Sequence, residues 1–317
     1  MQYSLNEVCI LPSNAPTDII SRATVNPFDE KGNLPIFTAP MTSVISKENY
    51  NIFKENKIIP IIPRNCCDFR KENPELWQAY SLKEFEDLVN LPGNYNGYHV
   101  LIDVANGHMR KIYDLVKEAK VKWPNIIIMI GNIANPAIYT DCCLAGVDYV
   151  RVGVGGGGAC LSSVLLGIHA SHPYMIQEIK KLSCYYSNPH RTKLIADGGI
   201  DSISKAIKCL AMGFDYVMMG KLLAQCKEAC GELKNGLRTY YGMASEHGQM
   251  DLSGTITKNP EGIETTIPVI DTLPEFTKRF EASLRSAMSY TGAHTLEEFH
   301  QSKWDYQSIN EFNAYNK

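Results

Sequence analysis

The 317-residue sequence has no excess of basic residues, no long apolar run and no regular cysteine pairs. Its 31 Lys and Arg residues are balanced by 34 Asp and Glu residues, and the net charge of -3 argues against a nucleic-acid-binding surface. No apolar run approaches the ~18 residues that a membrane span needs. The beginning of the sequence also lacks the charged-then-apolar order of a signal peptide. We therefore expect a cytoplasmic protein without nucleic-acid or membrane partners.

The ten cysteines are scattered along the chain and lack the CxxC spacing of a zinc site. Most are therefore expected to be small buried hydrophobic residues, and the spacing of Cys226 and Cys230 indicates helix packing rather than a metal site. The composition, with 44% hydrophobic and 21% charged residues, is that of an ordinary globular chain.

Short apolar runs alternate with helical patterns. The runs are continuous, which is typical of parallel strands buried on both faces. They occupy residues 34–40, 58–63, 98–104, 125–131, 148–154, 193–199 and 214–220, and the clearest helical patterns occupy 106–122, 136–145, 173–182, 202–212 and 275–290. This repeat predicts an α/β fold in which residues 1–317 form a single (β/α)8 TIM barrel, with a doubly wound sheet as the alternative. Gly, Asp and Asn residues at the strand ends favour the barrel.

A glycine-rich stretch, GVGGGGACLSS at 153–163, places five glycines before Cys160. Glycines allow positive φ and leave backbone N–H groups free to converge on an anion or a reacting atom. Cys160 at the end of this run is a candidate nucleophile. Taken alone, the run fits a flexible loop with an incidental thiol equally well.

The loops after the last two predicted strands also carry glycines, in DGGI at 197–200 and MGKLL at 219–223. Successive glycine-bearing loops of this kind hold phosphate on backbone N–H groups in barrels. Asp197 is placed to bind sugar hydroxyls, although an Asp in a turn before Gly is also a common cap.

The motifs GVGGGGAC, IADGGI, VMMGKLLA, YYGMAS, NPEGIE and LRSAMSYTGA stand in the order and spacing of the IMP dehydrogenase and GMP reductase family. The chain resembles that family from SLNEVCILP at 4–12 to about residue 300.

The resemblance implies a divergent GMP reductase. Dehydrogenases of the family usually carry an inserted CBS regulatory domain of roughly a hundred residues, whereas only residues 66–97 separate PRNC from the next predicted strand. They also use an Arg–Tyr pair on a flap, and residues 248–262 contain neither. IDVANG and YGMASE are similar to the reductase forms. We therefore expect NADPH-dependent conversion of GMP to IMP and ammonia, with residues 246–264 as a mobile active-site flap.

The site residues follow from the resemblance. Cys160 would attack purine C2 and form a covalent thioimidate, while Ser162 with Glu261 would supply the proton for ammonia. Ser162 could instead cap a helix, and Glu261 could be a solvated carboxylate. The implied catalytic residues are Cys160, Ser162, Glu261 and Arg64. The implied substrate-binding residues are Asn132, Gly158, Asp197, Gly198, Gly199, Gly220, Lys221, Tyr240, Met243, Ala244 and Ser245.

The cofactor is expected to be NADPH, with NADH as the alternative. Asp103 and Asn106 would contact the nicotinamide ribose or cap the following helix, and Lys258 would contact the extra phosphate or remain solvated. No metal is expected apart from a monovalent cation such as K+, with Gly153, Gly155 and Cys160 as its candidate ligands. Family members form tetramers, so a homotetramer is expected.

Four positions depart from the family pattern. Gly158 stands where the family has a phosphate-binding Ser, and Lys221 stands where it has Gly or Ser. Arg64 replaces the Lys that is usual in reductases, and Thr42 replaces an Asp. These changes fit a shifted preference, such as a deoxynucleotide or modified purine. An IMP dehydrogenase without the regulatory domain, converting IMP to XMP with NAD, and a non-catalytic purine nucleotide sensor both remain open.

Overall fold

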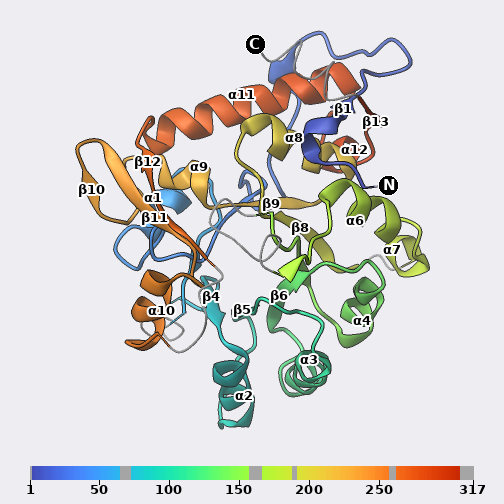
Figure 1. The fold of residues 1–317 in the computed structure, drawn as a ribbon. Helices are drawn as coiled ribbons and strands as arrows, with labels where there is room; N and C mark the ends of the chain where they lie inside the picture. Colours follow the sequence, from blue (N-terminus) through green and yellow to red (C-terminus); the bar gives the residue numbers. More distant parts are fainter. Residues whose placement is uncertain (1, 65–72, 157–165, 188–190, 257–261, 308–317) are drawn as a thin grey trace.

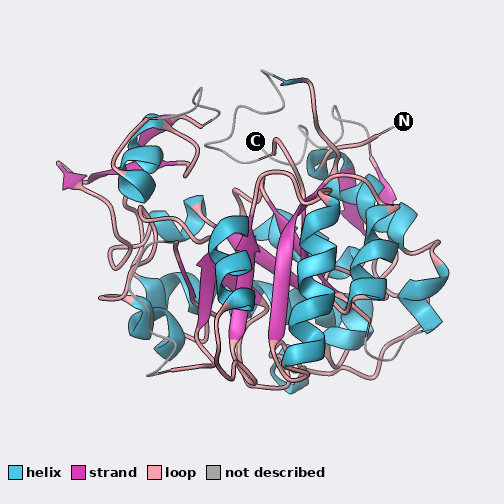
Figure 2. Ribbon diagram, turned by 90° about the horizontal axis from the view of Figure 1, so that it is seen from below, coloured by secondary structure: helices cyan, strands magenta, loops and turns pink. Residues whose placement is uncertain are grey.

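The computed structural model describes residues 2–64, 73–156, 166–187, 191–256 and 262–307. Within these residues, eight parallel strands form one sheet in the order β2-β9-β8-β7-β6-β5-β4-β3. Helices surround the strands (Figures 1 and 2). The strands are β2 (Ile36–Thr38), β3 (Ile61–Ile62), β4 (Trp77–Tyr80), β5 (His99–Asp103), β6 (Ile127–Ile133), β7 (Tyr149–Val152), β8 (Lys193–Asp197) and β9 (Tyr216–Met219).

The first and last strands of this order, β2 and β3, meet at a short seam that closes the barrel. The Thr38 N–H donates to Ile59 O over 3.0 Å, and the Ile59 N–H donates to Ile36 O over 2.9 Å. The Ile61 N–H then donates to the Thr38 hydroxyl oxygen over 2.8 Å. The predicted (β/α)8 barrel is thus confirmed, and the doubly wound alternative is wrong.

One barrel strand, β4, was not among the predicted strands, because residues 66–97 were interpreted as a connection. Its sequence WQAY is only four residues long and has no β-branched residue, so it lacks the pattern of a buried strand. With β4 counted as the third barrel strand, each later strand has a position number one higher than predicted. The loop with Cys160 then follows the sixth barrel strand, and the two glycine-bearing loops follow the seventh and eighth, where barrels commonly bind phosphate.

The five predicted helices correspond to α3, α4, α6, α8 and α11, with bounds within four residues of those predicted. The described helices are more numerous, and several have local capping signals at their ends. They include α1 (Tyr50–Glu55), α2 (Leu82–Asn90), α3 (Arg110–Lys122), α4 (Ile138–Ala145), α6 (His172–Ile179), α7 (Ser183–Ser187), α8 (Ile203–Met212), α9 (Lys221–Ala224), α10 (Glu246–Ser253), α11 (Leu273–Thr291) and α12 (Leu296–Phe299). Ser81 and Glu84 form a capping box at α2, as Thr272 and Glu275 do at α11. The predicted helix 106–122 begins later, at Arg110, because residues 104–109 form a loop.

Alternation along the strands divides the core into two parts. Leu101 and Ile195 lie with Phe37, Trp77 and Met218 in a cluster inside the barrel. Their strand neighbours, such as Val100 and Leu194, pack outward against the helices in the larger cluster. This double burial accounts for the continuous apolar runs in the sequence.

Two smaller sheets lie outside the barrel. One is the antiparallel sheet of β10 (Leu233–Lys234), β11 (Leu237–Tyr241) and β12 (Glu264–Pro268), which projects to one side near α10 (Figure 1). The other pairs β1 (Val8–Ile10), which follows the 3-10 helix η1 (Leu5–Glu7), with β13 (Trp304–Tyr306). A second 3-10 helix, η2, covers Arg22–Thr24. Among the described helices, none is long and apolar enough to cross a membrane.

Candidate active site

An ionic cluster lies at the carboxyl ends of β5, β7 and β8. Arg151 on β7 donates from Nη1 to Asp103 Oδ1 over 2.5 Å and from Nη2 to Asp197 Oδ2 over 2.9 Å. Arg64, just after β3, lies with its Nε 3.4 Å from Asp103 Oδ2. Arg151 is buried, which opposes its charge, but Asp197 and Asp103 outweigh burial and raise the pKa of its guanidinium. These carboxylates are therefore held in fixed positions.

Asn132, near the end of β6, joins the same cluster. Its Nδ2 donates to Asp197 Oδ2 over 2.7 Å and to Gly153 O over 2.7 Å. The backbones of β6 and β7 approach each other closely here because Gly131 has no side chain. A Cβ on Gly131 would lie 2.5 Å from Arg151 Cβ. Asn132 thereby fixes both Asp197 and the first residue of the glycine-rich stretch.

Three glycines allow close backbone approaches around this cluster. A Cβ on Gly153 would lie 2.1 Å from Asp197 O, and one on Gly199 would lie 3.0 Å from Gly156 O. A Cβ on Gly220 would lie 2.8 Å from Tyr240 Oη. Gly199 also has φ of +73°, a conformation that favours glycine. The predicted substrate-binding residues Gly199 and Gly220 thus lie where the absence of a side chain permits these close contacts. Lys221 follows Gly220 directly as the first residue of α9.

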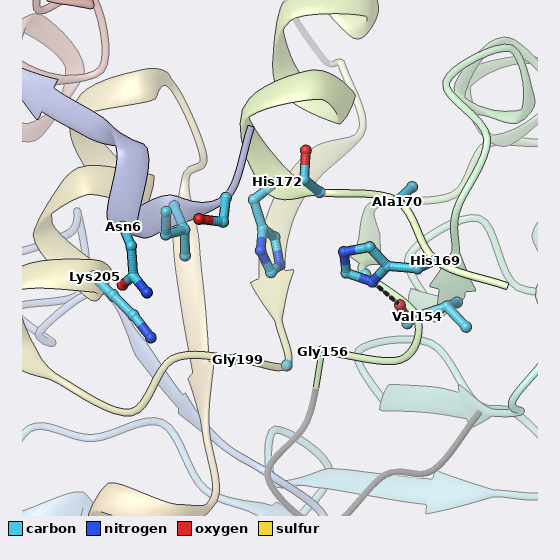
Figure 3. Close-up of a pocket in the computed structure, with 13 residues that line it drawn as sticks. Asn6, Val154, Gly156, His169, Ala170, His172, Gly199 and Lys205 are labelled. Atoms are coloured by element: carbon cyan, nitrogen blue, oxygen red, sulfur yellow. Dashed lines mark hydrogen bonds between the residues drawn. The ribbon is translucent and has the colours of Figure 1, made fainter. Parts of the chain in front are cut away.

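The described part of the glycine-rich stretch lines a pocket with residues of the N-terminal segment. Figure 3 shows His169, His172, Gly156 and Gly199 around it. The Nε2 of His172 lies 3.1 Å from Asp197 O, within hydrogen-bond distance of this carbonyl. Burial lowers the pKa of His172, so the neutral ring supports the Asp197 backbone. Neither histidine was predicted as a site residue.

The predicted base-binding residues Met243, Ala244 and Ser245 form the turn between β11 and α10. The Ser245 hydroxyl accepts from the Gly248 N–H over 3.1 Å and caps α10, so this side chain already has a structural partner. Met243 is half-buried, and its Sδ lies 3.7 Å from the Thr42 hydroxyl. Their roles in base recognition stay predictions.

The predicted cofactor residues have local partners as well. Both carboxylate oxygens of Asp103 face arginines, as described above, rather than a following helix N-terminus. Asn106 Oδ1 accepts from the His108 N–H over 3.1 Å in a turn before α3. Both remain close to the barrel mouth at the end of β5.

Several predicted residues lie outside the described residues: Cys160, Ser162, Gly158, Glu261 and Lys258. The same holds for part of the predicted flap, whose described portion contains α10 and the start of β12. Of the candidate cation ligands, Gly153 offers a carbonyl that already accepts from Asn132. The described residues contain no cluster of three His, Cys, Asp or Glu side chains suited to a metal.

The geometry defines a parallel α/β barrel in which two strands end in a fixed pair of carboxylates, Asp103 and Asp197, beside closely packed glycines. Residues 94–312 match the model of the IMP dehydrogenase / GMP reductase domain. The chain belongs to this family. The resemblance inferred from the sequence motifs is thereby confirmed.

Similar curated proteins are named inosine-5'-monophosphate dehydrogenase. That of Nitrosopumilus maritimus is 32% identical over 235 residues, which cover 69% of this chain and 48% of the relative. That of Chlorobaculum parvum is 34% identical over 215 residues, covering 63% of this chain and 43% of the relative. The chain therefore spans about half or less of the length of these relatives.

Proposed function

We propose that the protein is a GMP reductase, which uses NADPH to convert GMP to IMP and ammonia. The observation that carries this proposal is the stretch 248–262, which contains neither of the two residues, Arg and Tyr, that family dehydrogenases use to activate water. The connection from β3 to β4 supports it, because only residues 63–76 lie between these strands, too few for an inserted domain.

In the proposed reaction, the Cys160 thiolate forms a bond to C2 of GMP and the C2 amino group leaves as ammonia. Ser162 with Glu261 delivers the proton that the leaving amine needs. When bound, the reduced nicotinamide supplies a hydride to C2. The C2–S bond then breaks, returning the electron pair to Cys160 and releasing IMP.

The described residues support binding of a nucleotide. Asp197 is held by Arg151 and Asn132, so its carboxylate is preorganised to accept from ribose hydroxyls. The missing Cβ at Gly220 leaves the Tyr240 hydroxyl room to reach a phosphate. Lys221, next in sequence, adds a positive charge there. Arg64 keeps its charge beside Asp103, and since a guanidinium does not give up its proton, its role would be electrostatic.

A spectrophotometric assay tests the proposal. Purified protein with GMP and NADPH is expected to consume the reduced nicotinamide in proportion to IMP and ammonia formed. The parallel reactions contain dGMP in place of GMP, and NADH in place of NADPH, to define the nucleotide and cofactor preference. No consumption with any guanine nucleotide would contradict the reductase assignment.

IMP dehydrogenase activity is the second candidate, because the similar curated proteins carry that name. It would oxidise IMP to XMP with NAD, so mixing IMP and NAD should then produce reduced nicotinamide. A gain of signal with IMP and NAD, without loss on GMP and NADPH, would select this activity. For either activity we also propose a cytoplasmic homotetramer, as the family resemblance implies.

A further inference from the structure

One oxygen atom of Asp251 accepts hydrogen bonds from two separate parts of the chain. Thr42, in the loop after β2, donates from its hydroxyl to Asp251 Oδ2 over 2.6 Å. Tyr241, the last residue of β11, donates from its hydroxyl to the same oxygen over 2.7 Å. The two hydroxyl oxygens lie 3.1 Å apart. Hydrogen bonds of this length to an ionised carboxylate are among the stronger ones in proteins.

Tyr241 is suited to remain the donor in this arrangement. Its side chain is buried, with a residue exposure of 5%. Burial raises the pKa of Tyr241 to about 12, so the phenol keeps its proton at neutral pH. Asp251 lies on α10, so the bonds connect this helix to both the barrel and the small sheet.

A second contact from the same face of α10 reinforces the connection. His247 precedes Asp251 by four residues and therefore lies one helical turn away on that face. Its ring stacks on the Tyr241 ring, with centroids 4.1 Å apart and an interplanar angle of 15°. His247 Nδ1 also lies 3.2 Å from Glu264 Oε2 at the start of β12. The helix is thus fixed against Tyr241 at two points.

The position of α10 determines the position of the preceding turn. Gly248 packs directly against that turn: a Cβ on Gly248 would lie 2.5 Å from Gly242 O and 2.6 Å from Met243 Cα. The Ser245 cap and the Ser245 N–H, which donates to Gly242 O over 2.9 Å, tie the same residues together. Displacing α10 would therefore displace the residues 243–245.

We propose that Asp251 is a positioning residue for purine recognition, holding the turn 243–245 against the barrel through Thr42 and Tyr241. This rests on the proposed function in one respect, that the turn contacts the base. The interaction between Thr42 and Asp251 joins one hydroxyl and one carboxylate at contact distance. The same pair can be built in the opposite order, with the carboxylate at position 42, which provides a specific test.

The experiment compares D251T, T42D and the double variant T42D/D251T. Binding of GMP and of IMP is measured by calorimetry, and KM and kcat are measured in the reductase assay. We expect D251T to raise the Kd and KM of GMP about tenfold, as for loss of a hydrogen bond to a charged group, with kcat little changed. T42D places two carboxylates in contact and should weaken binding at least as much. The double variant should recover most of the affinity, because one carboxylate again faces one hydroxyl.

The matched control is D114N, which removes an exposed carboxylate on α3 and should leave the affinity and the thermal midpoint unchanged. A structural role alone would lower the thermal midpoint of D251T without changing the GMP affinity. That result, or additive losses in the double variant, would overturn the proposal. Binding is measured separately from turnover. A wild type that binds GMP without reducing it would therefore refute the reductase assignment, while the GMP affinities of the variants would still test the role of Asp251. A wild type that binds neither nucleotide would overturn both.

Discussion

His300 is a buried histidine whose protonation opposes folding. It follows α12, and its Nε2 is buried without a hydrogen-bond partner. Burial lowers the pKa of His300 from 6.5 to about 4, with Asp215 acting in the opposite direction and Arg191 adding to the decrease. The folded protein therefore binds this proton less tightly than the unfolded chain does.

The consequence is a loss of stability in acid. The contribution of neutral His300 is fully present above pH 6.5, falls as the pH drops through this value, and is lost at about pH 4. We expect a decrease in the unfolding free energy of about 3 kcal/mol over this range. Urea unfolding at several pH values, comparing wild type with H300L, measures it, and the variant should show a flatter profile. The control H294Q alters a half-buried histidine that is paired with the exposed Asp18, and should keep most of the wild-type slope. Equal slopes for wild type and H300L would contradict the assignment.

Among single residues, Arg151 belongs to the candidate site but was not predicted as a site residue. Asp197 was predicted from its place before a glycine-bearing loop, and Asp103 and Asn132 from the family resemblance, whereas the residue that joins them was interpreted only as part of the strand 148–154. Alternation contained the missing signal: Asp103 and Asp197 lie two residues after the inward-facing Leu101 and Ile195, so both carboxylates point inward. Two inward carboxylates in a barrel need an inward cation, and Arg151 is the charged residue on the two strands, β6 and β7, that lie between them.

At the level of elements, a buried arginine holds the connection between α9 and β11. Arg238 on β11 is 2% exposed. Its guanidinium donates to five backbone carbonyls, those of Cys226, Lys227, Ala229, Cys230 and Gly231. The residues after α9 thus obtain their hydrogen-bond partners from one planar group rather than from a further element.

Replacing Arg238 should therefore destabilise this connection strongly. R238M leaves the carbonyls buried without their donor, and we expect a loss of about 3 kcal/mol or more in the free energy of unfolding. R238K should recover only part, because an ammonium cannot span the same set of acceptors. Urea unfolding provides the measurement. K234M, on the exposed hairpin strand β10, serves as the control with little expected effect, and similar values for K234M and R238M would disprove this role of Arg238.

Strand β4 is the barrel strand that the sequence pattern did not predict. The other barrel strands contain continuous apolar runs. They were predicted with longer bounds than they have, except β6, which begins and ends two residues later than the predicted run 125–131. Gln78 interrupts the pattern in β4 although it is buried, because its Nε2 donates to Pro63 O over 2.9 Å. Its buried partner lies on another part of the chain, so no local sequence signal identifies it.

At the scale of the whole molecule, the barrel is closed by few hydrogen bonds at the seam between β2 and β3. The Thr38 side chain is fully buried and supplies the acceptor for the Ile61 N–H. T38V preserves the shape but leaves this N–H without an acceptor. We expect a loss of about 1–3 kcal/mol in stability and faster amide exchange in residues 58–62.

Hydrogen exchange read out by mass spectrometry, together with urea unfolding, tests the seam. T277V is the matched control, since the Thr277 hydroxyl is also buried but donates back to Leu273 O and Pro274 O within α11. Its effect should be small and should not reach residues 58–62. Unchanged exchange at the seam in T38V would show that closure does not depend on this hydroxyl.

The ionic cluster at the barrel mouth has a consequence for the electric field there. Arg64 and Arg151 carry two positive charges, and Asp103 and Asp197 two negative ones, so the four formal charges sum to zero. These four residues together exert almost no long-range electrostatic attraction on an approaching dianion, because their charges cancel. They attract it only at contact distance. Every single substitution that neutralises one member would leave a net unit charge within these four residues and so change the charge at the mouth by one unit. The sign of that charge would decide whether anions in solution are drawn toward the barrel or kept away from it.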